Sequence, residues 1–182
     1  MGRSNVGKSS LINSLVRQPV ARTSSTPGKT RLANVYRVAR GAGTPFYLVD
    51  LPGYGFARGG SDDFQAITRA FFGQDRLDLA AILIVDSRHP GLRSDSAAWR
   101  WLHSTVDESA VVATKIDKLA RGQRIRALRE LESVFDAPVA PVSAVTGEEL
   151  DELWKLMDRL ANNRSPRSSS PRRATGPRHQ KK

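Results

Sequence analysis

The hydrophobic residues of this chain follow two spacings, one typical of buried strands and one typical of amphipathic helices. Residues 79–85 and 109–114 are continuous apolar runs, which indicate strands buried on both faces. Residues 32–40 and 45–51 are rich in Val, Tyr and Phe, and they predict two strands joined through a glycine-containing turn. A shorter apolar run at residues 138–142 predicts the last strand.

Apolar residues recur at helical spacing in the segments between these strands. Alternating strands and helices predict an α/β protein with a mainly parallel sheet, in which ligands bind at the carboxyl ends of the strands. The predicted helices cover residues 8–17, a segment from Asp62 or Asp63 to about residue 72, and residues 94–104, 125–135 and 147–160. The side chains expected to share an inward face are Ala98, Trp101 and Leu102, and, in the last helix, Leu150, Leu153, Trp154, Met157 and Leu160.

The most specific chemical motif follows Met1 directly and fits the phosphate-binding loop, Gly-x-x-x-x-Gly-Lys-Ser/Thr. Its glycines let backbone N–H groups curl toward phosphate oxygens, and the helix that follows points its N-terminus at them. Lys8 is expected to reach the β- and γ-phosphates, and Ser9 to offer its hydroxyl to Mg²⁺. The motif comprises Gly2, Arg3, Ser4, Asn5, Val6, Gly7, Lys8 and Ser9.

A second polar segment follows the predicted strand at residues 45–51. It reads Asp50, Leu51, Pro52 and Gly53. The carboxylate is expected to hold a water on Mg²⁺, and the Gly53 N–H to reach the γ-phosphate. Asp and Gly are also ordinary turn residues, so the position of this segment downstream of the phosphate loop is what gives it weight.

Base recognition is predicted after the strand at residues 109–114, where the sequence reads Thr114, Lys115, Ile116 and Asp117. Guanine presents two adjacent donors, N1–H and the exocyclic amine, which one carboxylate can accept, and adenine lacks that pair. Asp117 is therefore the predicted base reader, with Lys115 packed over the base. The backbone of Val142, Ser143 and Ala144 is expected to meet the guanine O6.

Composition and charge narrow the possible classes of protein. The chain has 182 residues, 39% hydrophobic content and a net charge of +11, of which +7 falls in residues 162–182. That segment is rich in Ser, Pro and Arg and is expected to be a disordered basic tail behind a domain at residues 1–161, either contacting a polyanion such as RNA or aiding solubility. The absence of cysteine excludes disulfides and thiol nucleophiles, and no apolar run reaches the roughly 20 residues of a membrane span.

Taken in order, these motifs resemble the guanine-nucleotide motifs of small GTPases, and more narrowly the EngB family within the TrmE-Era-EngA-EngB group of bacterial GTPases. The likeness extends over nearly all of residues 2–160. It rests on residues 2–13, 22–24, 26–30, 50–55 and 86–90, the last reading Asp86-x-Arg88-His89-Pro90.

The resemblance implies a three-layer P-loop GTPase fold that binds GTP and GDP with Mg²⁺. It also implies action in assembly of the large ribosomal subunit, through the subunit or its rRNA, with a link to cell division and septation. Apart from the resemblance, the absence of cysteine fits the cytoplasm, and a monomer with no membrane contact is expected. Gly28, Lys29, Thr30, Arg31 and Leu32 would form the segment over the γ-phosphate, with Thr30 as the second Mg²⁺ ligand. The residues alone leave Thr23, Thr26 and Thr30 as equal candidates. Asn5 matches a position that holds K⁺ in potassium-activated relatives.

Two departures from the family pattern carry expectations of their own. Tyr54 follows Gly53 where Ras-like enzymes have a water-orienting glutamine, so no catalytic side chain is assigned and intrinsic hydrolysis is expected to be slow. Family members also carry a strand before the phosphate loop, so the domain is expected to be truncated at its N-terminus. Two alternatives remain: an ATP-using phosphotransferase, and an RNA-binding basic protein with a degenerate nucleotide site.

Overall fold

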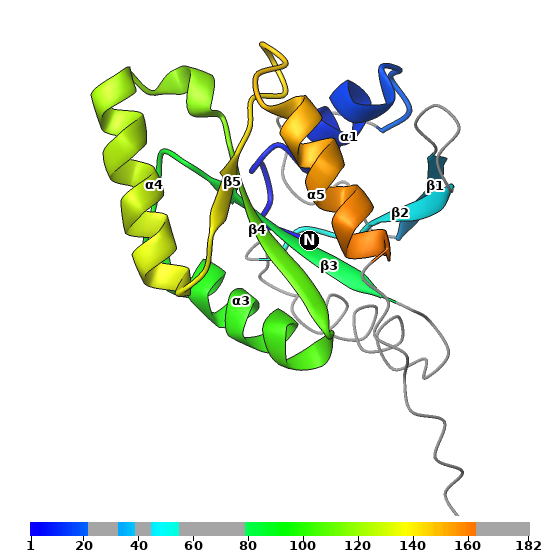
Figure 1. Ribbon diagram of the computed structural model, residues 1–182, viewed down its shortest axis with the longest axis horizontal. Coiled ribbons are helices and arrows are strands. Elements are labelled where there is room, and N and C mark those ends of the chain that lie inside the picture. Colours follow the sequence, from blue (N-terminus) through cyan, green and yellow to red (C-terminus); the bar gives the residue numbers. More distant parts are fainter. Residues whose placement is uncertain (22–32, 39–44, 55–78, 163–182) are drawn as a thin grey trace, which may run out of the picture.

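The computed structural model describes residues 1–21, 33–38, 45–54 and 79–162. In chain order, the described elements are α1 Lys8–Val16, β1 Asn34–Val38, β2 Phe46–Asp50, β3 Ala80–Asp86, α3 Arg93–Thr105, β4 Glu108–Thr114, the short 3₁₀ helix η1 Ile116–Lys118, α4 Arg121–Phe135, β5 Val139–Pro141 and α5 Leu150–Asn162. Helix α1 is followed by β1, β2 and β3, and α-helices and strands alternate from α3 onward, as Figure 1 shows.

Strands β3, β4 and β5 form a parallel sheet in that order, with Leu83 opposite Val111 and Val111 opposite Val139. Successive side chains of a strand point to opposite faces, so each strand here supplies two cores. Leu83 and Val111 face the side covered by α3 and α4, whereas Val112 faces the side covered by α1 and α5 (Figure 1). Continuous apolar runs are therefore required in β3 and β4, as the sequence indicates.

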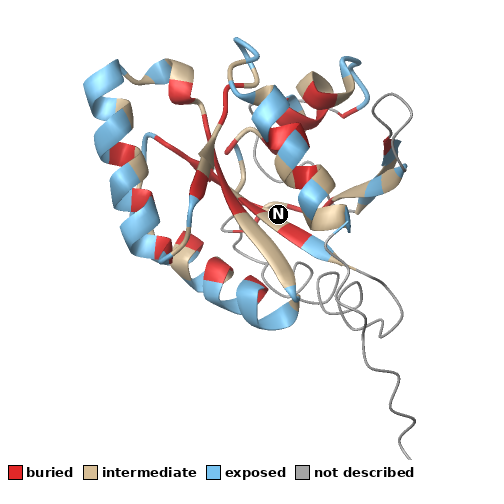
Figure 2. Ribbon diagram, in the orientation of Figure 1, coloured by how far each residue is buried: buried red, intermediate tan, exposed pale blue. Residues whose placement is uncertain are grey.

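Each helix covers the sheet with one apolar stripe, which appears as the buried face of the ribbons in Figure 2. Helix α3 buries Trp99 and Leu102, and the indole N–H of Trp99 donates to the Phe135 carbonyl at 2.9 Å, which ties α3 to the end of α4. Helix α5 buries Leu153, Trp154 and Met157 against the other face. The result is three layers, helices–sheet–helices.

Strands β1 and β2 pair antiparallel as a separate two-stranded sheet. Among the described residues, the segment 1–3 lies between β3 and Tyr54, which follows the last residue of β2 by four positions. Met1 exchanges backbone hydrogen bonds with β3, donating to Ile82 O at 2.6 Å and accepting from Ile84 N at 2.8 Å. Gly2 bridges Ile84 and Arg3 bridges Tyr54, both in parallel fashion. The phosphate-loop motif thus begins between β3 and the loop that follows β2.

The predicted elements within the described residues are confirmed to within a few residues, although the last helix begins at Leu150 rather than at residue 147. One inward-facing prediction is wrong, because Trp101 is 37% exposed and its neighbour Trp99 is the buried tryptophan of α3. The predicted loop at residues 22–31 and the helix at residues 62–72 lie outside the described residues. None of the described helices is long and apolar enough to cross a membrane.

Candidate functional site

The loop between residue 2 and α1 has a curled backbone with two residues in the left-handed region. Gly7 caps α1 with φ of 96°, a conformation that suits glycine, and Asn5 also has a positive φ of 64°. The Lys8 ammonium turns back into the curl and donates to the carbonyls of Gly2 at 3.1 Å and Arg3 at 3.0 Å. Because α1 begins at Lys8, the positive end of its dipole faces the same space.

Lys8 and Asp50 form the electrostatic centre of this region. Lys8 is 9% exposed and Asp50 is 5% exposed. Burial lowers the pKa of Lys8 and raises the pKa of Asp50, and the attraction between the two charges opposes both shifts. A buried ammonium beside a carboxylate is suited to meet a polyanionic ligand together with its cation.

The loop that follows β2 packs directly on the phosphate loop. The Ser4 N–H donates to the Tyr54 carbonyl at 3.3 Å. A Cβ placed on Gly53 would lie 2.8 Å from Ser4 N and 2.9 Å from Ser4 Oγ, closer than real side chains approach. Glycine at position 53 is therefore a steric requirement of this contact, which brings the predicted γ-phosphate donor beside the phosphate loop.

The carboxyl end of β4 holds the phosphate loop from the other side. The Thr114 hydroxyl, which is buried, lies 2.6 Å from Val6 O and 3.0 Å from Val85 O, so it links the loop to two strands. Lys115, in a left-handed conformation with φ of 62°, donates to Asn5 O at 2.6 Å. These contacts join the first motif to the base-recognition motif.

Asp117 lies in η1 with its carboxylate held in place by its neighbours. The Ser143 hydroxyl donates to Asp117 Oδ1 at 2.7 Å, and the Lys118 ammonium lies 3.3 Å from Oδ2. Partial burial opposes the charged form, but the hydrogen bond from Ser143 and the attraction of Lys118 outweigh it, so the pKa of Asp117 lies below its usual range. The side chain is an ionised acceptor at neutral pH, as a reader of two adjacent N–H donors must be.

The Ser143 hydroxyl makes three hydrogen bonds, one as donor and two as acceptor. Ser143 is completely buried, and its hydroxyl oxygen accepts from the N–H groups of Val145 at 3.2 Å and Thr146 at 3.1 Å while donating to Asp117. The turn after β5 therefore orients the hydroxyl, and the hydroxyl orients the carboxylate. The predicted segment 142–144 meets the predicted base reader through this one side chain.

Asp86 is a member of the site that sequence reasoning quoted only as part of a family motif. Its carboxylate is 5% exposed and accepts from Arg88 Nη2 at 2.7 Å and from Lys115 Nζ at 2.8 Å. Burial alone raises the pKa of this carboxyl, but the hydrogen bonds from Arg88 and Lys115 hold it well below its usual range. Asp86 thereby fixes the lysine predicted to pack over the base.

The structure thus brings together four of the five predicted segments: residues 2–9, 50–53, 114–117 and 142–144. The fifth, comprising Gly28, Lys29, Thr30, Arg31 and Leu32, lies outside the described residues. Ser9 occupies the first turn of α1, as a ligand for Mg²⁺ requires, and the oxygen donors of Ser9 and Asp50 are of the kind a hard cation prefers. Sequence reasoning missed Asp95, whose position within α3 carries no signal in the sequence alone.

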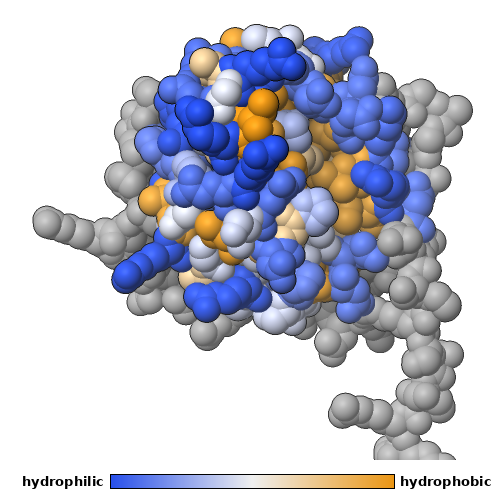
Figure 3. All heavy atoms as spheres, turned by 60° about the vertical axis from the view of Figure 1, so that its left-hand side comes forward, coloured by the Kyte–Doolittle hydropathy of each residue, from blue (hydrophilic) through white to orange (hydrophobic). Residues whose placement is uncertain are grey.

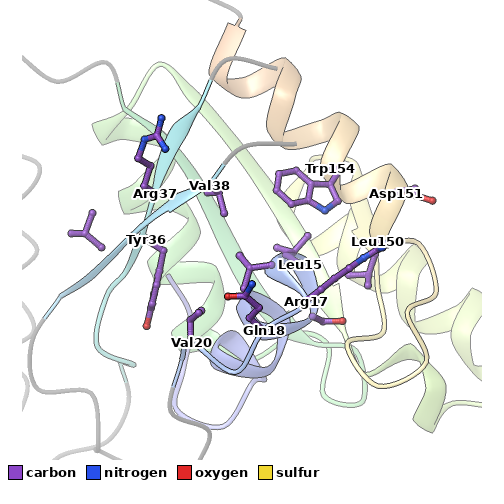
Figure 4. A pocket seen from close by; sticks show the side chains of 13 residues that line it. Leu15, Arg17, Gln18, Val20, Tyr36, Arg37, Val38, Leu150, Asp151 and Trp154 are labelled. Atoms are coloured by element: carbon purple, nitrogen blue, oxygen red, sulfur yellow. The ribbon is translucent and has the colours of Figure 1, made fainter. Parts of the chain in front are cut away.

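A separate pocket of about 720 Å³ lies at the opposite end of α1. Figure 4 shows Leu15 and Val38 on its walls beside Trp154, with Arg17 and Gln18 at the end of the helix. Since the phosphate loop joins α1 at Lys8, a helix length separates this pocket from the converging polar groups. The candidate nucleotide site is the rim of loops, and the pocket has no part in it.

Comparison with known proteins agrees with this geometry. Residues 1–115 match the family described as "50S ribosome-binding GTPase". The chain is 39% identical over 179 residues to a probable GTP-binding protein EngB of Heliobacterium modesticaldum, covering 91% of this chain and 83% of the relative. The chain belongs to the EngB family. A second EngB protein, from Anoxybacillus flavithermus, is 41% identical over 167 residues, covering 87% of this chain and 84% of the relative.

Solved structures support the same fold. A crystal structure of a probable GTP-binding protein EngB matches with a TM-score of 0.65 at 23% identity, covering 90% of this chain and 97% of that one. Era in complex with MgGDPNP and nucleotides 1506–1542 of 16S ribosomal RNA matches with a TM-score of 0.73 at 22% identity, covering 87% and 54%. The three-layer P-loop GTPase fold predicted from the sequence is confirmed, and this EngB-family chain is a GTP-binding protein of a GTPase family.

Proposed function

We propose that this EngB-family chain is a guanine-specific switch that binds GTP and GDP with Mg²⁺ and hydrolyses GTP slowly. One observation carries the proposal: the oriented, ionised Asp117 is linked to the phosphate loop through Lys115 and Thr114. Base reader and phosphate cradle are thus built as one rigid unit, at the carboxyl ends of the strands where ligands of such sheets bind.

The base preference follows from the chemistry of Asp117. A carboxylate with a lowered pKa accepts from both the N1–H and the amine of guanine, whereas adenine lacks this pair of donors and would cover the carboxylate without replacing its hydrogen bonds to water. A site built to pair with a polar group rejects an analogue lacking it by up to about 10⁴-fold or more. This argument disfavours an ATP-using phosphotransferase.

In the proposed complex, the hydroxyls of Ser9 and Thr30 would hold Mg²⁺, and Asp50 would accept a hydrogen bond from a water on the ion. When bound, the ion would supply positive charge beside the phosphates. Lys8 supplies a second positive charge, and Gly53 a backbone donor to the γ-phosphate. The Asn5 carbonyl accepts from Lys115, and the side chain of Asn5 is proposed as a K⁺ ligand in the family manner.

Slow intrinsic hydrolysis is supported by the side chain that follows Gly53. Tyr54 is 9% exposed and its hydroxyl donates to Asp95 at 3.0 Å, so it points into the protein rather than toward a water at the γ-phosphate. Among the described residues, no side chain occupies the water-orienting role of glutamine in Ras-like enzymes. GTP therefore persists long enough for the bound state to act as a signal.

The test is a competition experiment on the folded chain with labelled GDP. Unlabelled GTP and GDP should displace it and ATP should not, and Asp117→Asn should shift preference from guanine to xanthine nucleotides, because xanthine replaces the amine donor with a carbonyl. Glu152→Gln, which breaks an exposed ion pair on α5, is the matched control and should leave displacement unchanged. Equal displacement by ATP and GTP in the unaltered chain would refute guanine specificity.

We also propose that the chain contacts the large ribosomal subunit through rRNA and acts in its assembly in the cytoplasm as a monomer, with the family link to cell division and septation as a downstream effect. Support comes from α4, whose first three turns expose Arg121, Arg126 and Arg129 on a face that is largely hydrophilic (Figure 3). Arg121 lies in the first turn, where a cation opposes the helix dipole, so it suits an external polyanion. The basic segment at residues 162–182 adds to this charge.

Binding to large-subunit rRNA at several salt concentrations tests this part separately. Affinity should fall as salt rises, and deletion of residues 163–182 should weaken it without changing GTP affinity. If RNA binding persists in Lys8→Ala while the unaltered chain binds no nucleotide, the alternative is favoured: a basic RNA-binding protein with a degenerate nucleotide site.

A further inference from the structure

Asp95 is a buried carboxylate outside the predicted motifs that touches two of them. It lies in the first turn of α3 and is 2% exposed. Its Oδ1 accepts from Arg3 Nε at 2.9 Å and from the Tyr54 hydroxyl at 3.0 Å. Arg3 belongs to the phosphate loop, and Tyr54 follows Gly53, so a single oxygen holds both nucleotide loops.

The backbones of these two loops meet at the same place. Arg3 bridges Tyr54 in parallel fashion, and the Ser4 N–H donates to the Tyr54 carbonyl at 3.3 Å. Gly53 lies against Ser4 so closely that a Cβ does not fit. Asp95 therefore ties the side chains together where the main chains already join, which leaves little freedom between Gly53 and the phosphate loop.

A carboxylate buried to this degree needs both of its partners. Burial raises the pKa of Asp95, while the hydrogen bond from Tyr54 and the charge of Arg3 act in the opposite direction. Anchoring α3 does not require the group, because Trp99 and Leu102 already pack this helix into the core. The contact pattern of Asp95 is directed at the nucleotide loops rather than at the helix packing.

We propose that Asp95 is a positioning residue that fixes the separation between Gly53 and the phosphate loop, and so favours a nucleoside triphosphate over a diphosphate. The inference rests on the proposed function, in which the Gly53 N–H meets the γ-phosphate. A diphosphate reaches the phosphate loop alone, whereas a triphosphate must satisfy both loops at once. Holding the loops in register therefore raises affinity for GTP selectively.

The first test is Tyr54→Phe, which removes the hydroxyl and keeps the buried ring. Binding of a non-hydrolysable GTP analogue and of GDP is measured by calorimetry. Affinity for the analogue should fall about 5- to 10-fold, the effect of one hydrogen bond to a charged group, while GDP affinity stays within about twofold. A purely structural role would lower both affinities equally or lower neither, and either result would overturn the proposal.

The second test is a double-mutant cycle with Asp95→Asn. If Tyr54 acts through Asp95, the double variant should bind the analogue no more weakly than Asp95→Asn alone, whereas independent effects would multiply. Glu152→Gln again serves as the control carboxylate and should change neither affinity. If the unaltered chain fails to bind guanine nucleotides at all, the proposed function fails; if it binds them and the ratio of the two affinities is unmoved in Tyr54→Phe, this inference alone fails.

Discussion

The Ser143 hydroxyl donates to Asp117 Oδ1 at 2.7 Å while accepting two backbone N–H groups of its own turn. Ser143→Ala removes the donor, so the Asp117 carboxylate loses its orientation and the pKa of Asp117 rises. We expect guanine nucleotide affinity to fall about 10-fold, which corresponds to about 1.4 kcal/mol. Calorimetry with GDP measures the loss.

The matched control for this change is Ser109→Ala. Like Ser143, Ser109 on β4 makes one hydrogen bond to another side chain, here to His103 Nδ1 at 2.9 Å. Ser109 lies at the opposite end of β4 from the site. Its substitution should leave GDP affinity unaltered. An equal loss in both serine variants would show that the effect comes from general destabilisation rather than from Asp117.

The lowered pKa of Asp86 predicts that the free energy of unfolding falls in acid. Its pKa is lowered in the folded protein relative to the ordinary value of 3.8, so its stabilising contribution is present above about pH 4 and is lost as the pH falls through the folded pKa. Asp86→Asn should lower the free energy of unfolding at pH 7 by about 2–4 kcal/mol, because Arg88 and Lys115 lose their partner. Urea unfolding between pH 7 and pH 2 should show a shallower acid limb in the variant. A parallel limb would contradict the assignment.

Gly53→Ala tests the contact between the two nucleotide loops. The added Cβ would lie 2.8 Å from the Ser4 backbone nitrogen, which cannot swing aside as a side chain can. We expect the loops to separate and affinity for a GTP analogue to fall about 10-fold or more, with a smaller effect on GDP. Gly122→Ala on exposed α4 is the matched control, since its Cβ makes only an ordinary contact with the Arg126 side chain at 3.9 Å and should stabilise the helix by about 0.5–1 kcal/mol.

Thr114→Val removes the hydroxyl that bridges Val6 O and Val85 O and keeps the shape of the side chain. The single buried O–H donor that these two carbonyls share is then lost, so we expect a loss of about 1–3 kcal/mol in unfolding free energy together with weaker nucleotide binding. Thermal unfolding and GDP titration measure the two effects. Thr105→Val, which removes an exposed hydroxyl bonded to the Trp101 carbonyl, should change neither by a comparable amount.

The sequence predicted the strands and the positions of the phosphate loop and of Asp117, because each depends on local spacing. Short continuous apolar runs rich in Val and Ile favour strands buried on both faces, and residues after such strands lie at one edge of the sheet. It did not predict which tryptophan of α3 is buried, since Trp99 and Trp101 differ by two positions and either fits an inward stripe of some width. The hydrogen bond from the Trp99 indole N–H to the Phe135 carbonyl, which holds Trp99 in its buried position, joins residues 36 positions apart.

The partners of the site residues were missed for the same reason. Asp95 lies 92 positions from Arg3 and 41 from Tyr54, and nothing in the α3 sequence marks it as more than a helix-start carboxylate. Asp86 is the last residue of β3, and that position alone is consistent with a site residue. Its pairing with Lys115, however, depends on the left-handed backbone conformation of that lysine. Local pattern thus predicted the candidate ligand-facing groups, and only the tertiary structure showed the groups that hold them.

Within the described part of the chain, the segment 1–3 links β3 to Tyr54 in the loop that follows β2. A nucleotide gripped by the loop that continues from this segment should resist separation of the two sheets. Amide protons of Val38 and Phe46, at the end of the antiparallel pair away from Asp50, should then exchange with deuterium more slowly when GDP is added, although neither residue belongs to the nucleotide site.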